Sequence, residues 1–410
     1  MNEQRRHRLR GTLPLALTLL LPPAMPAASL AGQLTVSSEL QSAWYPREGT
    51  GGRVSTDADL RGWSSVEGRR ALGKGMELHG DLTIYGSHIR RAVIDGEAAL
   101  VWRTPTMEIA AGLLREQWGR FPNSTLDALG PVNTAFGLVA PERRLSQPTL
   151  RATAFLDGVS IDVYAMAGAR RQPLPESDGR FGFGVPSRDV APHGAMGDQS
   201  VAVRVSASKL DVDWSAHVFT GRSRRPTFVP QFTSSAALDS VDAIYNEVLQ
   251  IGGDVETTRA DWRFLSEGFL RRGGVDVLGR ARTYGAMSAA AEYQRLGAFD
   301  GAYNLIPRVE FAADSRGTAA DIPFSSSLRA GMRVATTDRL ATQIDVAYLY
   351  DWAFRGHGVM ASAEKALAES PTVNLGFRLT AFTGSRTPSV LAIWKNDLEL
   401  YSYVRIEVSR

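Results

Sequence analysis

The sequence predicts an all-β protein, a single closed antiparallel transmembrane β-barrel of 16 to 18 strands. Three observations predict it: alternating strand segments, an N-terminal export signal, and connections that alternate between short and long. In residues 210–218, for example, Leu, Val, Trp and Ala occupy every second position, with Asp, Ser and His between them. This period of two is typical of strands, and apolar-out, polar-in alternation is typical of outer-membrane barrels. A soluble β-sandwich could also alternate apolar and polar residues, but charged residues in so many of the alternating segments would be unusual in a sandwich.

The N-terminus has the order of a secretory signal peptide. Four arginines between residues 5 and 10 precede an apolar run over residues 13–21, and small residues follow, ending at Ala31. The apolar run is too short for a membrane anchor, which needs roughly 20 residues. We therefore expect residues 1–31 to be a cleaved signal peptide and residues 32–410 to be the barrel.

The composition excludes several classes of function. Without residues 1–31 the chain would carry 42 basic and 42 acidic residues, so the high pI does not indicate binding of nucleic acid. The chain has no Cys, which excludes disulfides, thiolate metal sites and cysteine nucleophiles. Its six His show no zinc-binding spacing, and no phosphate-binding loop is present, so we expect no metal and no cofactor.

Alternation and turn residues place 18 strands along the chain, with boundaries that are the least certain part of the assignment. The predicted strands are residues 34–44, 53–63, 75–86, 90–103, 106–115, 148–157, 158–168, 198–208, 210–220, 243–255, 257–270, 281–293, 303–314, 326–336, 340–351, 358–369, 371–383 and 397–408. If the first two assignments are wrong, the number falls to 16. The last segment alternates to the end of the chain, although it closes on Ser409-Arg410 where such barrels commonly end on an aromatic residue.

The connections between the predicted strands differ in length in a regular way. Short ones carry turn residues and lie at 104–105, 157–158, 256–257, 337–338 and 370–371, and long ones lie at 116–147, 169–197, 221–242, 315–325 and 384–396. Bacterial barrels have short periplasmic turns and longer outer loops, so both termini are expected in the periplasm. The rule weakens near 64–74 and 86–90, where the lengths are reversed.

The most distinctive stretch follows the fifth predicted strand. It reads Trp118-Gly119-Arg120-Phe121-Pro122, then Leu126-Asp127 and Gly130-Pro131-Val132-Asn133. It resembles the pattern of Trp-Gly followed by Asp, Pro and Asn in porin-like barrels related to the alginate-export type. The resemblance implies a family of outer-membrane barrels but no particular solute. In general porins the third outer loop folds inward, and a long loop in this position is expected to narrow the pore; an ordinary surface loop is the alternative.

Charged residues in the alternating rows are assigned to the lumen. On the lipid face each would cost roughly 2 to 4 kcal/mol near the bilayer midplane. The predicted pore-lining residues are Arg91, Glu97, Arg103, Arg115, Trp118, Arg120, Asp127, Asp213, Arg259, Asp261, Arg263, Arg308, Glu310, Arg329, Arg333 and Arg378. Opposed rows of Arg and acids would filter polar solutes, although for any single residue a pairing role in the wall is the simpler alternative. Of the 46 basic residues 42 are Arg, which suits an anion pathway, but the neutral total gives no selectivity.

Together these features predict a passive outer-membrane channel for small polar solutes, embedded in outer-membrane lipid. An export conduit for polysaccharide or lipid, working with periplasmic partners, is the first alternative, and an occluded structural or surface barrel is the second. A barrel hydrolase is disfavoured: Ser206-Ala207-Ser208-Lys209 matches S-x-x-K but lies on a predicted strand, and neighbouring inward residues such as Ser215 and His217 do not make a triad. The sequence leaves open the solute, its direction and whether the chain forms a homo-oligomer.

Overall fold

The fold is that of a computed structural model of the 410-residue chain. The structure describes residues 33–44, 59–87, 93–121, 144–168, 170–173, 185–190, 199–235, 237–320, 326–369, 372–384 and 398–409. The predicted signal peptide, residues 1–31, therefore lies outside the described residues. No helix in the described part of the chain is long and apolar enough to cross a bilayer.

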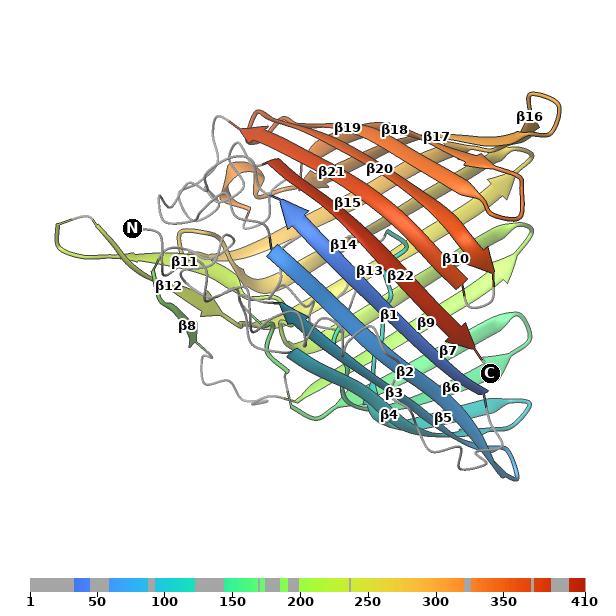
Figure 1. Ribbon diagram of the computed structural model, residues 1–410. Helices are drawn as coiled ribbons and strands as arrows, with labels where there is room; N and C mark the ends of the chain where they lie inside the picture. Colours follow the sequence, from blue (N-terminus) through green and yellow to red (C-terminus); the bar gives the residue numbers. More distant parts are fainter. Residues whose placement is uncertain are drawn as a thin grey trace, which may run out of the picture.

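Eighteen strands form one closed antiparallel barrel, as the sequence predicts (Figure 1). They are β1 (Gln33–Trp44), β2 (Asp59–Gly73), β3 (Met76–Ser87), β4 (Val93–Arg103), β5 (Met107–Leu114), β6 (Gln147–Leu156), β7 (Val159–Met166), β9 (Ser200–Lys209), β10 (Val212–Arg222), β13 (Glu247–Arg259), β14 (Trp262–Val275), β15 (Ala281–Tyr293), β17 (Tyr303–Asp314), β18 (Ser327–Thr336), β19 (Thr342–Asp351), β20 (Gly356–Glu369), β21 (Thr372–Gly384) and β22 (Leu398–Ser409). Each pairs with the next in the chain, and β22 pairs with β1 from Thr35 opposite Ser409 to Trp44 opposite Leu400. Closure leaves no open sheet edge, which a barrel in lipid requires.

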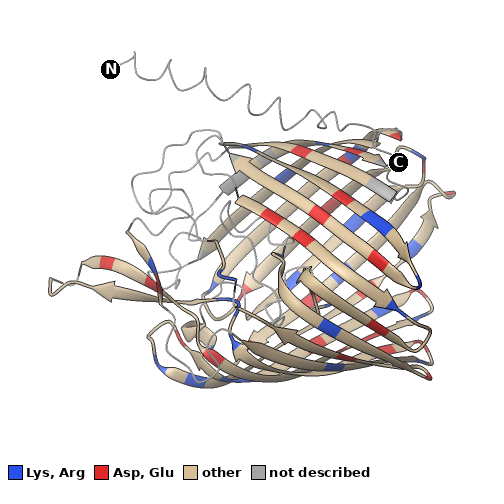
Figure 2. Cartoon of the chain, turned by 90° about the horizontal axis from the view of Figure 1, so that it is seen from below, with Lys and Arg blue, Asp and Glu red and all other residues tan. Residues whose placement is uncertain are grey.

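The two faces of the wall differ in chemistry as the alternation predicts. Large apolar side chains on the outer face are widely exposed, for example Ile251 (56%), Leu270 (57%) and Val346 (49%). Polar and charged side chains on the inner face are largely buried, among them Asp95, Gln250 and Glu267. Figure 2 shows acidic and basic residues interspersed on strands around the barrel. A wall that is apolar outside and polar inside fits a barrel in lipid around a hydrated bore.

The two ends of the barrel are unlike. At one end, which we call the turn end, short links such as Lys74-Gly75, Leu210-Asp211 and Ala260-Asp261 join the strands. At the other, the loop end, longer segments connect them (Figure 1). The strand directions place Gln33 and Ser409, the outermost described residues, at the turn end. Both ends of the described barrel thus lie on the side of the short turns, the side that the sequence analysis assigns to the periplasm.

Three predicted strands are displaced. The second, predicted at 53–63, is observed at 59–73, because its outward row includes Ser64, Gly68 and Arg70 and so conceals the alternation. This shift restores the regular order of short and long links that seemed broken at 64–74. The predictions 243–255 and 257–270 are observed at 247–259 and 262–275, since the turn lies at 260–261 and not at 256–257.

Two long loops contain strands that the sequence analysis missed. β8 (Ser187–Val190) pairs in parallel with β12 (Leu238–Ile244), which forms an antiparallel hairpin with β11 (Thr227–Phe232). This small sheet projects from the loop end (Figure 1). At the turn end, β16 (Arg295–Ala298) pairs with the beginning of β17 and extends that hairpin beyond its neighbours. The sequence of β16 is short and mixed in polarity, so in the sequence it resembles a loop.

Candidate functional site

The candidate site is the inner wall of the barrel together with residues 115–121, which we call the inner segment. The inner segment leaves β5 and contacts the inner faces of strands from β3 to β17, and it does not project outward from the loop end. The inward folding predicted for the loop is thus seen over residues 115–121. Residues 122–143, including the predicted Asp127, lie outside the described residues.

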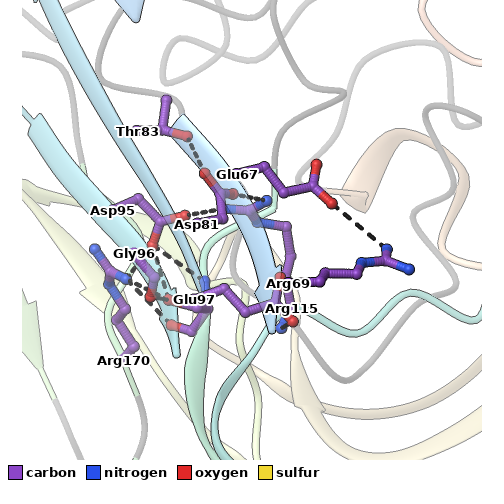
Figure 3. Close-up of polar contacts among 10 residues, drawn as sticks. Glu67, Arg69, Asp81, Thr83, Asp95, Gly96, Glu97, Arg115 and Arg170 are labelled. Carbon is purple, nitrogen blue, oxygen red and sulfur yellow. Dashed lines mark hydrogen bonds and ion pairs between the residues drawn. The ribbon is translucent and has the colours of Figure 1, made fainter. Parts of the chain in front are cut away.

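Asp95 on β4 fixes the beginning of the inner segment (Figure 3). Its carboxylate is almost fully buried and accepts hydrogen bonds from Arg115 Nη2 (2.7 Å), from the backbone N–H of Ser146 (3.2 Å) and from Arg170 Nη1. Arg115 also donates through Nη1 to Asp81 Oδ2 on β3 (2.8 Å). One carboxylate therefore joins three chain segments that are far apart in sequence, and charge-assisted bonds of this kind are the strong ones.

The next contact joins the inner segment to β6. Arg151 Nη1 donates to Glu116 Oε1 (2.6 Å), while Arg151 Nη2 donates to Glu108 Oε1 on β5 (2.5 Å). Arg103 completes the group through Nε to Glu108 Oε2 (2.7 Å). Burial raises the pKa of Glu116 to about 7, and the attraction of Arg151 only partly opposes that rise.

Trp118 seats the middle of the inner segment in an apolar part of the wall. Its indole is 4% exposed and packs in a cluster with Tyr164, Met166, Ala202, Phe219 and Val248. The ring meets Tyr164 edge-on at 5.5 Å between centroids and lies tilted over His217 at 4.6 Å. Aromatic contacts of this geometry contribute beyond the area that they bury.

Arg120 connects the end of the inner segment to β13 and β14. It donates from Nε to Asp254 Oδ1 (2.7 Å), from Nη1 to Glu256 Oε2 (3.1 Å), and from its backbone N–H to Glu267 Oε2 (2.7 Å). Phe121 then packs on Leu265 and Ala290, with the guanidinium of Arg308 5.5 Å from the centre of its ring.

From Arg120 a row of charges of alternating sign continues along the inner wall, which we call the charge ladder. Its members from β9 to β18 are Arg204, Asp254, Arg120, Glu256, Arg263, Glu292, Arg308, Glu310 and Arg329. Neighbours approach to 3.2, 2.7, 3.1, 2.7, 3.1, 2.7, 3.1 and 3.8 Å in that order. Each charge is thus compensated by its neighbours, yet Arg263 and Arg329 keep about a third of their side chains exposed to the bore.

Charged pairs also line the wall beyond the ladder. Arg333 on β18 donates to Asp345 on β19 (2.8 Å), and the Arg333 side chain is more exposed than those of the ladder residues. Across the closing strands, Arg405 Nε donates to Glu39 Oε2 (2.7 Å). The inner wall therefore presents both signs of charge around the barrel.

Most predicted pore-lining residues belong to this inner surface. The register places on it Glu97, Arg103, Asp213, Arg263, Arg308, Glu310, Arg329, Arg333 and Arg378, and the inner segment brings Arg115, Trp118 and Arg120 to the same surface. Arg91 lies outside the described residues.

Arg259 and Asp261 are corrections. Arg259 is opposite Trp262 across the turn, so it shares the outer face with that tryptophan, and Asp261 is a turn residue. The sequence analysis read residues 259–264 as one strand. The hairpin turn between Arg259 and Trp262 reverses the chain, and its Ala260 has a φ of 51°, a conformation for which Gly or Asn would be the usual signal.

Sequence reasoning missed several members of the charge ladder, and it also missed Glu116 of the inner segment. Glu256 was assigned to a turn, and Asp254, although within the predicted strand 243–255, was not among the predicted pore-lining residues. Glu292, Arg204 and Glu116 face partners on other strands, so only the register reveals them. One local signal was available for these residues. Asp254 and Glu256 are two positions apart, as two residues on the same face of a strand would be, and Arg263 follows shortly after them in the sequence. Among the described residues no cluster of His, Asp and Glu has the arrangement of a metal site.

Comparisons with known proteins agree with the fold. No protein-family model matches the chain, and no curated protein matches it by sequence. Among solved structures it is similar to OccAB3 of Acinetobacter baumannii (8% identity, TM-score 0.56, covering 92% of this chain and 99% of that one). It is also similar to two Pseudomonas aeruginosa proteins, OccK5 (8%, TM-score 0.53, 92% and 98%) and OccK2, solved in complex with glucuronate (9%, TM-score 0.52, 92% and 98%). These neighbours share the barrel fold; the likeness to alginate-export barrels remains a resemblance of one motif.

Proposed function

We propose that the chain is an outer-membrane channel for the passive passage of small polar solutes, narrowed by the loop that contains the inner segment. The observation that carries this proposal is the charge ladder joined to Arg120 on the inner wall. Burying a row of charges costs free energy unless opposite charges compensate it. In the charge ladder each charge is compensated by its neighbours, and Arg263 and Arg329 still remain partly exposed to the bore. Fixed charges on a wall orient and filter solutes that pass it.

The direction of insertion follows from the two ends. Short turns lie on the periplasmic side of bacterial barrels, so the turn end is assigned to the periplasm and the small sheet of β8, β11 and β12 to the cell surface. The proposed pore-lining residues are those on the inner surface together with the inner segment. Acidic sugars are a reasonable first probe because arginine forks bind carboxylates, and OccK2, a protein of the same fold, was solved with glucuronate.

Ion selectivity in planar bilayers tests the proposal. The purified protein should produce stepwise openings, and the double variant Arg263→Glu/Arg333→Glu should move the reversal potential in a salt gradient toward cation preference, because two cations of the wall become anions. The matched control is Arg188→Glu on β8, which lies in the small projecting sheet and should leave the reversal potential unchanged. An unchanged potential in the double variant rejects the pore-lining assignment, and silence at all voltages supports an occluded barrel.

A further inference from the structure

At its turn end the outer face of the barrel carries cations without acids. The described outward strand positions near this end hold no Asp or Glu but five cations: Arg70, Lys209, Arg259, Arg295 and Lys365. All five are exposed, and within the described part of the chain none forms a salt bridge. In the proposed orientation this places positive charge at the periplasmic headgroup layer.

Two of these cations flank a pair of aromatic rings. Arg259 is opposite Trp262, and Trp262 is opposite Tyr293, so the three share one outward row across β13, β14 and β15. The rings of Trp262 and Tyr293 are 5.1 Å apart between centroids. Arg295 follows Tyr293 by two residues and faces outward opposite Leu305. The nearby acid, Asp261, lies in the turn and accepts a hydrogen bond from the Tyr293 hydroxyl (3.4 Å).

An apolar groove begins in the row next to these residues. It has a volume of about 430 Å³ on the outer face of strands β13 to β17. Small side chains form its floor, namely Ser266, Ala289 and Ala291, which lie between larger ones, Val255, Phe264, Val309 and Phe311. Rows two residues apart on a strand are separated by about 7 Å, so the groove lies directly toward the bilayer centre from the arginine row.

We propose that this groove, with Arg259 and Arg295 at its end, binds one anionic phospholipid of the periplasmic leaflet. The proposal rests on the membrane insertion given under the proposed function but not on solute passage. The groove binds an acyl chain, because small side chains at its floor and bulky apolar side chains along its sides leave a narrow apolar channel on the surface. The two guanidinium groups take the lipid phosphate, and the Trp262 and Tyr293 rings occupy the interface between the two, where such rings prefer to lie.

Charge complementarity selects this occupant over a second barrel. A copy of this chain would bring the same outward row to the groove, and among the described residues that row carries arginines but no acid at this level, since the nearby Asp261 lies in the turn. An anionic headgroup supplies the missing negative charge. A zwitterionic lipid supplies an acyl chain but no net charge, so it should bind more weakly.

Native mass spectrometry of the delipidated full-length barrel in detergent tests the proposal. Phosphatidylglycerol and phosphatidylcholine with identical acyl chains serve as probes. We expect one phosphatidylglycerol to bind more tightly than phosphatidylcholine. Arg259→Gln/Arg295→Gln should weaken phosphatidylglycerol binding roughly 30-fold, since each cation near a membrane surface contributes about a factor of five to ten. Ala289→Phe, which fills the floor, should weaken binding of both lipids.

Arg70→Gln is the matched control, because it removes a cation of the same rim on β2, which is many strands away from the groove. Strand content by circular dichroism verifies that each variant is folded, and the conductance of the arginine variant is expected to be unchanged. Equal binding of the two lipids, or equal loss in the Arg70 variant, overturns the proposal. A change from oligomer to monomer in Ala289→Phe without a lipid preference also overturns it, in favour of a subunit interface.

Discussion

At the scale of single residues, carboxylates of the inner wall each form ion pairs with more than one arginine. Asp95 receives Arg115 and Arg170, and Glu256 receives Arg120 and Arg263. A buried charge of this kind is tolerated because its partners offset the loss of hydration, and removing one partner typically costs roughly 3 to 5 kcal/mol. Glu116 differs, since burial is the dominant influence on its carboxyl group, and among the described residues Arg151 is its one hydrogen-bond donor.

Channel selectivity should depend on pH through Glu116. Its pKa is raised to about 7, so the carboxyl group is neutral below that pH and ionised above it. As the pH falls through 7, the inner segment loses one negative charge and anion preference should increase. Reversal potentials measured between pH 5.5 and 8.5 check this, and Glu116→Gln should give the acidic value throughout. A wild-type protein without a transition near 7 would contradict the assignment.

The same raised pKa has a consequence for stability. The folded-state pKa of Glu116 lies above its ordinary value of 4.5, so the group favours the folded state most at low pH. That contribution is lost as the pH rises from about 4.5 to beyond about 7. The inner segment should therefore be held more firmly in mildly acid than in alkaline solution.

At the scale of elements, the inner segment is held by apolar contacts of Trp118 and Phe121 and by charged contacts at Arg115, Glu116 and Arg120. Trp118 lies between Arg115 and Arg120, and each of these arginines bonds two acids of the wall. The charged contacts set where the inner segment begins and ends. The buried indole supplies the apolar contribution, which for a Trp truncated to Ala is typically about 3 to 5 kcal/mol.

Trp118→Ala should loosen the inner segment and raise single-channel conductance, with greater current noise. The loss leaves a space among Tyr164, Phe219 and Val248 that the wall cannot fill. Trp214→Ala is a control on the same strand pair, because Trp214 faces outward on β10 and is 40% exposed. Conductance in planar bilayers is the measurement. Equal currents in both variants would show that the inner segment does not narrow the pore.

At the scale of the whole molecule, the closed wall separates two environments, and the register assigns every strand residue to one of them. Val346 on β19 faces outward and is 49% exposed, whereas Gln343 on the same strand faces inward and donates to Asp345 (2.7 Å). A shift of one residue in register would exchange the two faces. The pairing of β22 with β1 completes the separation.

Val346→Lys should lower the free energy of unfolding by about 2 to 4 kcal/mol in lipid vesicles, because a cation on the lipid face near the midplane is poorly solvated. Gln343→Lys should have little effect, since the inner face is polar and Asp345 lies within reach. Urea unfolding in vesicles, followed by tryptophan fluorescence, measures both. Comparable losses in the two variants would contradict the assignment of faces.

Local alternation was sufficient to predict a closed barrel of 16 to 18 strands, of which 18 are observed, because a wall between lipid and water imposes a period of two on every strand. Where outward residues were polar, as in Ser64 and Arg70, or where a turn used Ala260 instead of Gly, the local signal failed. The pairing within the charge ladder could not be predicted, although Arg120, Arg263, Arg308, Glu310 and Arg329 were assigned to the lumen from the sequence. Its members are paired across strands and through a loop, so only the register and the inward path of residues 115–121 bring them together.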